Sequence, residues 1–160
     1  MPRYTSPSRL PEPARMEIAD ALKATLVDGL DLHGQIKVAH WNVKGPHFAA
    51  LHPLFETFAV SLAAFNDQIA ERALTLGALA VGTSKHVAAH TRLPDYPQAE
   101  TDGLEHCRLL ADRIDVYLDA VRQARAVATK HDDQDTFDLL TGVATEFEKH
   151  GWFLRATLAK

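Results

Sequence analysis

Hydrophobic residues recur every three or four positions along most of the chain, and polar residues stand between them. This spacing places apolar side chains on one face of an α-helix. The Gly45-Pro46 pair ends the first such pattern and predicts a helix over residues 14–43. Its apolar stripe repeats every four residues: Ile18, Leu22, Leu26 and Leu30.

The same periodicity predicts the remaining elements. Three further long helices are expected over residues 51–76, 101–129 and 136–159, with a short one at 87–90. Residues 83–100 contain Pro94 and Pro97 and are predicted to form a long connection. Nothing in the sequence alternates with the period of a β-strand. We therefore expect an all-α fold, a four-helix bundle with one long crossover connection.

The amino terminus differs in composition from the rest of the chain. Residues 1–13 hold four of the eight prolines, which predicts a flexible N-terminal arm followed by one bundle domain over residues 14–160. A chain of 160 residues with 46% hydrophobic residues is sufficient for one domain with a sizeable core.

Several classes of protein are excluded by composition. The single cysteine, Cys107, rules out an internal disulfide and a cysteine metal cluster. The amino terminus lacks the apolar run of a secretory signal, and no stretch approaches the roughly 20 apolar residues of a membrane span. We expect a cytoplasmic protein with no membrane partner. The formal charge of −4 favours no class of partner.

The predicted helix over residues 51–76 carries four candidate metal ligands on one face. At 100° per residue, His52, Glu56, Asp67 and Glu71 lie within an arc of about 100°, and the apolar stripe lies on the opposite side. The alternative interpretation is a solvated helix face with polar pairs four residues apart.

These four ligands cannot meet within one chain. His52 and Asp67 are about 22 Å apart along the helix axis, whereas metal–ligand bonds are about 2 Å. The two pairs are, however, equidistant from a point between Ser61 and Leu62, so an antiparallel second copy would bring them together in two identical sites. Three small residues on this face would allow close approach: Ala59, Ala63 and Ala70.

His40 lies on the preceding helix, across a tight turn, where it can complete the set of ligands. Two imidazoles and three carboxylates suit a first-row ion such as iron(II), manganese or zinc. Redox chemistry favours iron, because zinc carries no electrons.

Three segments resemble the Dps family of ferritin-like proteins, the DNA-protection proteins of starved cells: AHWNVKGPHF, LHPLFE and DQIAERALTLG. The resemblance covers the chain from about Ala14 to its end. It implies a ferritin-like four-helix subunit and a hollow dodecameric shell. It also implies that Fe(II) is oxidised by hydrogen peroxide at two-fold interfaces and that ferric mineral is stored inside. Nucleoid association in the cytoplasm would accord with DNA protection.

The ferroxidase ligands of the family fall on His40, His52 and Glu56 of one chain and on Asp67 and Glu71 of its mate. This chain departs from the family at Glu56, where aspartate is usual. Trp41 matches a family tryptophan beside the site, where it would quench radicals or carry an electron; the alternative role is packing.

A second resemblance concerns DDQDTFDLL, which is similar to the helix start that lines three-fold pores in the family. Asp133, Asp135 and Asp138 are therefore candidates for an iron entry pore, because a ring of carboxylates concentrates cations. The alternative is that these carboxylates only complement a helix dipole.

The other histidines are interpreted as surface or hydrogen-bonded residues. This holds for His33, His47 and His150, with zinc as the metal if one of them binds an ion. His86 and His90 form at best a weak surface metal pair.

Two other functions remain open from the sequence. A DNA-binding shell would act through the amino-terminal residues 1–15, which hold Arg3, Arg9 and Arg15 against one acid, Glu12. A structural shell would hold zinc in a weakly active site.

Overall fold

The computed structural model describes residues 5–159 and contains five helices there. Four are long: α1 (Glu12–Asn42), α2 (Phe48–Thr75), α4 (Gly103–Lys130) and α5 (Gln134–Leu158). A short helix, α3 (Ser84–His90), lies in the crossover that joins α2 to α4. The all-α prediction is confirmed, and each predicted helix end lies within three residues of the observed one.

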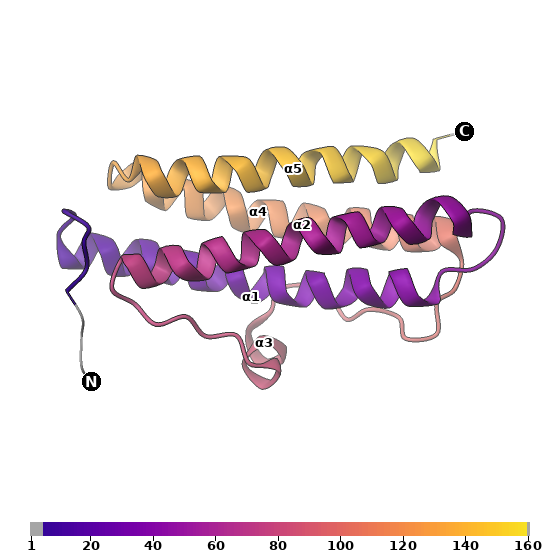
Figure 1. Ribbon diagram of the computed structural model, residues 1–160, viewed down its shortest axis with the longest axis horizontal. Coiled ribbons are helices and arrows are strands. Elements are labelled where there is room, and N and C mark those ends of the chain that lie inside the picture. Colours follow the sequence, from indigo (N-terminus) through magenta and orange to yellow (C-terminus); the bar gives the residue numbers. More distant parts are fainter. Residues whose placement is uncertain (1–4, 160) are drawn as a thin grey trace.

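The long helices form an antiparallel bundle in which α1 packs on α2 and α4, and α5 packs on α4 and α2 (Figure 1). The crossover runs from one end of the bundle to the other and carries α3 along the outside of α1 (Figure 1). This topology leaves one side of α2 without a neighbouring helix, and that side carries the candidate ligands.

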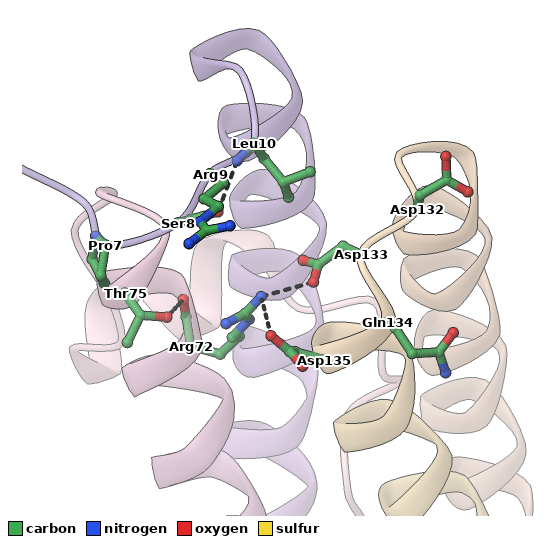
Figure 2. Close-up of a pocket in the computed structure, with 10 residues that line it drawn as sticks. All are labelled: Pro7, Ser8, Arg9, Leu10, Arg72, Thr75, Asp132, Asp133, Gln134 and Asp135. Carbon is green, nitrogen blue, oxygen red and sulfur yellow. Dashed lines mark hydrogen bonds and ion pairs between the residues drawn. The ribbon is translucent and has the colours of Figure 1, made fainter.

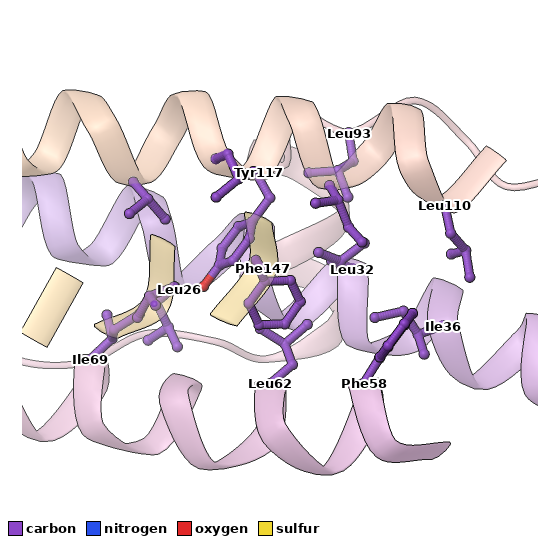
Figure 3. Packing of buried hydrophobic residues seen from close by; sticks show 14 of the residues in the cluster. Leu26, Leu32, Ile36, Phe58, Leu62, Ile69, Leu93, Leu110, Tyr117 and Phe147 are labelled. Carbon is purple, nitrogen blue, oxygen red and sulfur yellow. The ribbon is translucent and has the colours of Figure 1, made fainter. Parts of the chain in front are cut away.

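The core is built from the apolar faces of all four long helices. Figure 3 shows Leu32 and Ile36 of α1, Phe58 and Leu62 of α2, and aromatic rings from α4 and α5 meeting in the middle of the bundle. The rings of Tyr117 and Phe147 pack edge to face, with centroids 5.4 Å apart. Close packing of these side chains fixes the rotation of each helix about its axis.

The crossover is attached to the bundle by buried polar contacts. The guanidinium of Arg92 donates to the buried carboxylate of Asp28 at 2.8 Å. Arg113 donates to the side-chain oxygen of Gln35 at 2.6 Å and to the carbonyl of Asp95 at 2.7 Å. Because these buried groups bond to one another, a connection without helical periodicity still has a fixed path.

Side-chain hydrogen bonds connect the described residues near the beginning of α1 to the end of α2. α1 begins at Glu12, two residues before the expected boundary, with Pro13 in its first turn. Before it, the hydroxyl of Ser6 donates to the carbonyl of Thr75 at 2.6 Å. Arg15 donates to the carbonyl of Leu76 at 2.9 Å, so its charge is used inside the subunit. Arg3, the other predicted DNA contact beside Arg9, lies outside the described residues.

Two expectations about α2 need correction. Ala59 is buried in the bundle rather than on the ligand face, because it lies about 20° beyond His52 on the core side. Among the described residues, α2 is also long and apolar enough to span a membrane by length and composition, contrary to the expectation that no stretch approaches this. One such helix is weak evidence, since core helices of bundles pass the same test.

Candidate metal centre

His40 and His52 face each other where α1 ends and α2 begins. Nδ1 of His40 lies 2.8 Å from the carbonyl oxygen of His52, and Nδ1 of His52 lies 2.8 Å from the carbonyl oxygen of His40. The two rings stack with centroids 3.8 Å apart. The carbonyl of His40 belongs to the last turn of α1, whose carbonyls lack helical partners, so the second bond also caps this helix.

This reciprocal pairing fixes the tautomer of both imidazoles. A ring nitrogen that contacts a carbonyl oxygen must carry the proton, so each Nδ1 is a donor. In the neutral form of each ring the lone pair is therefore on Nε2, which is the usual arrangement of histidines that bind metals. The sequence predicts that the two side chains are near each other, but not this tautomer.

Glu56 lies one turn after His52 and adds a carboxylate to the pair. Its Oε2 is 3.5 Å from Nε2 of His40 and forms a short ion pair with the ammonium of Lys37. The hydrogen bond from Lys37 lowers the pKa of Glu56, so this carboxylate is ionised at neutral pH. The ammonium of Lys37 thus occupies the position beside the carboxylate of Glu56 that a bound metal ion would take.

Trp41 lies beside these groups and is 66% exposed. The ammonium of Lys37 is 5.7 Å from the centroid of its ring. A tryptophan with so little of its surface covered contributes little to the packing of one subunit. Its role beside the metal centre stays a prediction.

Asp67 and Glu71 lie further along the same face of α2 and are exposed. Neither carboxylate has a hydrogen bond or ion pair to another of residues 5–159 in the structure. Asp67 lines a pocket of about 410 Å³ between α1 and α2 together with His33, whose pKa is lowered by burial. No three histidine, cysteine or acidic side chains converge on one point within the described part of a single chain.

The comparisons with known proteins identify the family to which this chain belongs. Residues 19–160 match the family model of the ferritin-like domain. The DNA protection during starvation protein of Agrobacterium fabrum is 33% identical over 156 residues, which cover 98% of this chain and 96% of that protein. The chain belongs to the Dps family of ferritin-like proteins.

Solved Dps structures have the same fold. DpsC from Streptomyces coelicolor superposes with a TM-score of 0.93 at 30% identity, covering 99% of this chain and 92% of that one. A Dps protein from Vibrio cholerae O1 gives 0.90 at 25% identity, covering 98% of this chain and 99% of that one. The Vibrio protein is described as a member of a superfamily of ferritin-like diiron-carboxylate proteins.

The acidic start of α5 in this Dps chain separates into two kinds of residue. Asp133 is buried, caps the helix by accepting from the backbone N–H of Thr136, and forms an ion pair with Arg72 at 2.7 Å (Figure 2). Asp135 and Asp138 are exposed. Asp135 lies 3.9 Å from Arg72, and Asp138 accepts from the side-chain amide of Gln134 at 2.6 Å. Asp133 is thus the one of the three predicted pore carboxylates that is buried, and the pore role of all three stays a prediction.

The remaining histidines take different positions. His150 is buried under α2, with Nε2 3.0 Å from the hydroxyl of Ser61 and its ring stacked on Phe58. Burial lowers the pKa of His150 to about 4, so it is a neutral core residue. His47 is exposed at the start of α2.

Sequence reasoning missed a buried histidine in this Dps fold. Nδ1 of His106 forms a hydrogen bond of 2.6 Å with the hydroxyl of Tyr96, and the two rings stack. Burial lowers the pKa of His106 and raises that of the Tyr96 hydroxyl. No periodic signal marks Tyr96 because it lies in the crossover, so its partner on α4 was not recognisable.

Proposed function

We propose that this Dps-family chain assembles into a hollow dodecamer that oxidises Fe(II) with hydrogen peroxide at its two-fold interfaces and stores the ferric product inside. The observation that carries the proposal is the division of the ligand face of α2. One end supplies imidazoles with fixed, free lone pairs at His40 and His52. The other end supplies two carboxylates, Asp67 and Glu71, that have no partner among the described residues.

The exposed surface of α2 supports an antiparallel partner on this face. Only 28% of the most apolar part of the helix is buried in one subunit, and Val60 is 62% exposed. Val60 and Ala63 are equidistant from the midpoint of the ligand face, so each Val60 would contact Ala63 of the other copy. Covering this apolar surface stabilises the dimer, and the same arrangement unites the two halves of each metal centre.

In the proposed reaction Fe(II) is a substrate. Two Fe(II) ions each lose one electron, the O–O bond of one peroxide is cleaved, and two protons complete two water molecules. Because both electrons come from one site, hydroxyl radical is not released. His40 and His52 hold Fe(II) through Nε2, and the carboxylates of Glu56, Asp67 and Glu71 neutralise the additional charge of Fe(III).

The proposed route of iron into the shell uses the exposed carboxylates at the start of α5. Asp135 and Asp138 are exposed, and repetition of these carboxylates around a three-fold axis would produce a negative ring. Asp133 would hold this helix start in place through Arg72.

DNA binding is a second, weaker proposal for a cytoplasmic, nucleoid-associated shell. Arg9 is exposed, whereas Arg15 bonds to the end of α2, so each described arm offers one free cation. Twelve arms would add their weak attractions to phosphate. Retention by duplex DNA at low salt, lost on deletion of residues 1–10, would support this role.

The direct test of the oxidase proposal is anaerobic loading of the iron-free protein with Fe(II), followed by peroxide. Ferric absorbance and hydroxyl-radical trapping are recorded together. We expect rapid oxidation at two Fe(II) per peroxide with little trapped radical. Oxidation no faster than in buffer would contradict the proposal and favour a structural shell with a zinc-occupied centre.

A further inference from the structure

His86 and His90 form a pair of metal-binding side chains outside the proposed iron centre. They stand four residues apart on α3, so both imidazoles project from one side of this helix. Their rings stack with centroids 4.2 Å apart and planes inclined by 21°. Two nitrogen ligands at right angles, each about 2.0 Å from one ion, are separated by about 3 Å, so the rings are close enough to share an ion once they turn out of the stack and direct their lone pairs to one point.

The backbone fixes the reactive nitrogen of His90. Its Nδ1 lies 2.8 Å from the carbonyl oxygen of His86, so this nitrogen carries the proton. The Nε2 atom consequently has a free lone pair. The carbonyl contacts of His40 and His52 fix their tautomers in the same way.

The surroundings hold α3 in place and leave room for an ion. The hydroxyl of Thr83 caps the helix by accepting from the backbone N–H of His86. Both histidines line a pocket of about 380 Å³ between α3 and α1, in which bound water can complete the coordination of an ion. Two cations also line this pocket, and each has a carboxylate partner: Lys23 with Asp20, and Arg92 with Asp28.

The donor set selects the metal. None of the described residues that line this pocket is acidic, so the protein offers two imidazole nitrogens and no carboxylate. Among divalent first-row ions, such a set binds copper most tightly and iron(II) weakly. We infer that His86 and His90 form a copper(II) site on the crossover helix, separate from the carboxylate-rich iron centre.

The test is a Cu(II) titration of the assembled, iron-free protein against a competing chelator, with the electron paramagnetic resonance spectrum recorded at each step. Wild type is compared with H86Q, with H90Q and with H47Q, which removes another exposed histidine. We expect wild type and H47Q to bind one more Cu(II) per chain than H86Q or H90Q, and the signal of this extra copper to show nitrogen ligands.

Iron chemistry provides the second measurement. Since the inferred copper site is separate, H86Q and H90Q should oxidise Fe(II) at the wild-type rate. Equal copper stoichiometry and affinity in all four proteins would overturn the inference. Loss of iron oxidation together with the copper would overturn the separation of the two sites.

Discussion

The two ends of the ligand face of α2 differ in how much of their geometry one chain supplies. At the first end, His40 and His52 bond to each other's backbone, and Glu56 is held by Lys37. At the second end, Asp67 and Glu71 are exposed, and nothing among the described residues contacts their carboxylates through a hydrogen bond or ion pair. The first end is preorganised, whereas the second is a pair of side chains on a rigid helix.

The first end would determine how tightly iron binds, whereas the second end would make the centre depend on assembly of two chains. Preorganised imidazoles bind an ion without the entropic cost of ordering flexible side chains. In the proposed dimer, the carboxylates of Asp67 and Glu71 would become ligands when the partner places its imidazoles opposite them. A centre divided in this way would be complete only in the assembled protein, which would confine oxidation to the shell.

The largest expected effect comes from removing one ligand at either end. H52A and D67A should each lower the initial rate of Fe(II) oxidation by at least about 100-fold, since loss of even an outer-shell partner costs about 10–100-fold. The result for D67A is the informative one, because the carboxylate of Asp67 has no hydrogen bond or ion pair with another of residues 5–159. Stopped-flow ferric absorbance after peroxide addition measures both rates.

H47A and D119A are matched controls, because they remove an exposed histidine and an exposed carboxylate elsewhere. Both should remain within about twofold of wild type. Normal oxidation by D67A would show that the second end of α2 is only a solvated helix face.

The sequence predicts this division because helical periodicity alone determines which side chains share a face of α2. It does not predict the pairing of His40 with His52 through backbone carbonyls, because that contact depends on how tightly the chain turns after α1. Ala59 was misplaced for a related reason: its position near the edge of the face is decided by packing against the core.

The same limit applies to the acidic start of α5. The resemblance of this segment to the family suggested a pore lined by Asp133, Asp135 and Asp138, yet the sequence does not reveal that Arg72 of α2 reaches Asp133. A contact between residues 61 positions apart depends on the tertiary fold, and so does the pair of Tyr96 and His106.

Behind the midpoint of α2, His150 lies buried against Ser61, and its buried state can be tested through the pH dependence of stability. Because the pKa of His150 is lowered to about 4, protonation favours the unfolded chain as pH falls from about 6.5 towards 4. This residue alone should remove about 2 kcal/mol of stability by pH 5, relative to neutral pH. In H150F, urea unfolding midpoints at pH 7 and pH 5 should differ less than in wild type; an unchanged difference would contradict the assignment.

The stability of the protein near the second end should depend on the ion pair that anchors α2 to α5, between Arg72 and Asp133. R72M would leave the buried carboxylate of Asp133 without its cation and should destabilise the protein by about 1–2 kcal/mol, less than a fully buried pair because Arg72 is partly exposed. R122M removes an exposed arginine and should cost less than about 0.5 kcal/mol. Equal unfolding midpoints for the two variants would show that Arg72 is not an anchor.

The smallest effect is expected from Lys37, the residue at the first end that pairs with a candidate ligand without being one. K37M removes the cation that pairs with Glu56, so the pKa of Glu56 rises towards its ordinary value, yet the carboxylate stays ionised at neutral pH. Anaerobic Fe(II) binding should therefore tighten by about two- to fivefold as a competing charge is lost. K149M is the control on α5, and weaker binding by K37M would mean that Lys37 positions Glu56 rather than competes with iron.

The most direct test of a centre shared between chains is complementation within one shell. H52A and D67A subunits with different tags are expressed together, and shells that contain both are purified. Each heterodimer would have one centre with every ligand intact and one centre with both defects, so random pairing should restore about a quarter of the wild-type activity. Restored oxidation from two inactive parents is the predicted result; mixed shells as inactive as their parents would show that the ligands of each centre come from a single chain.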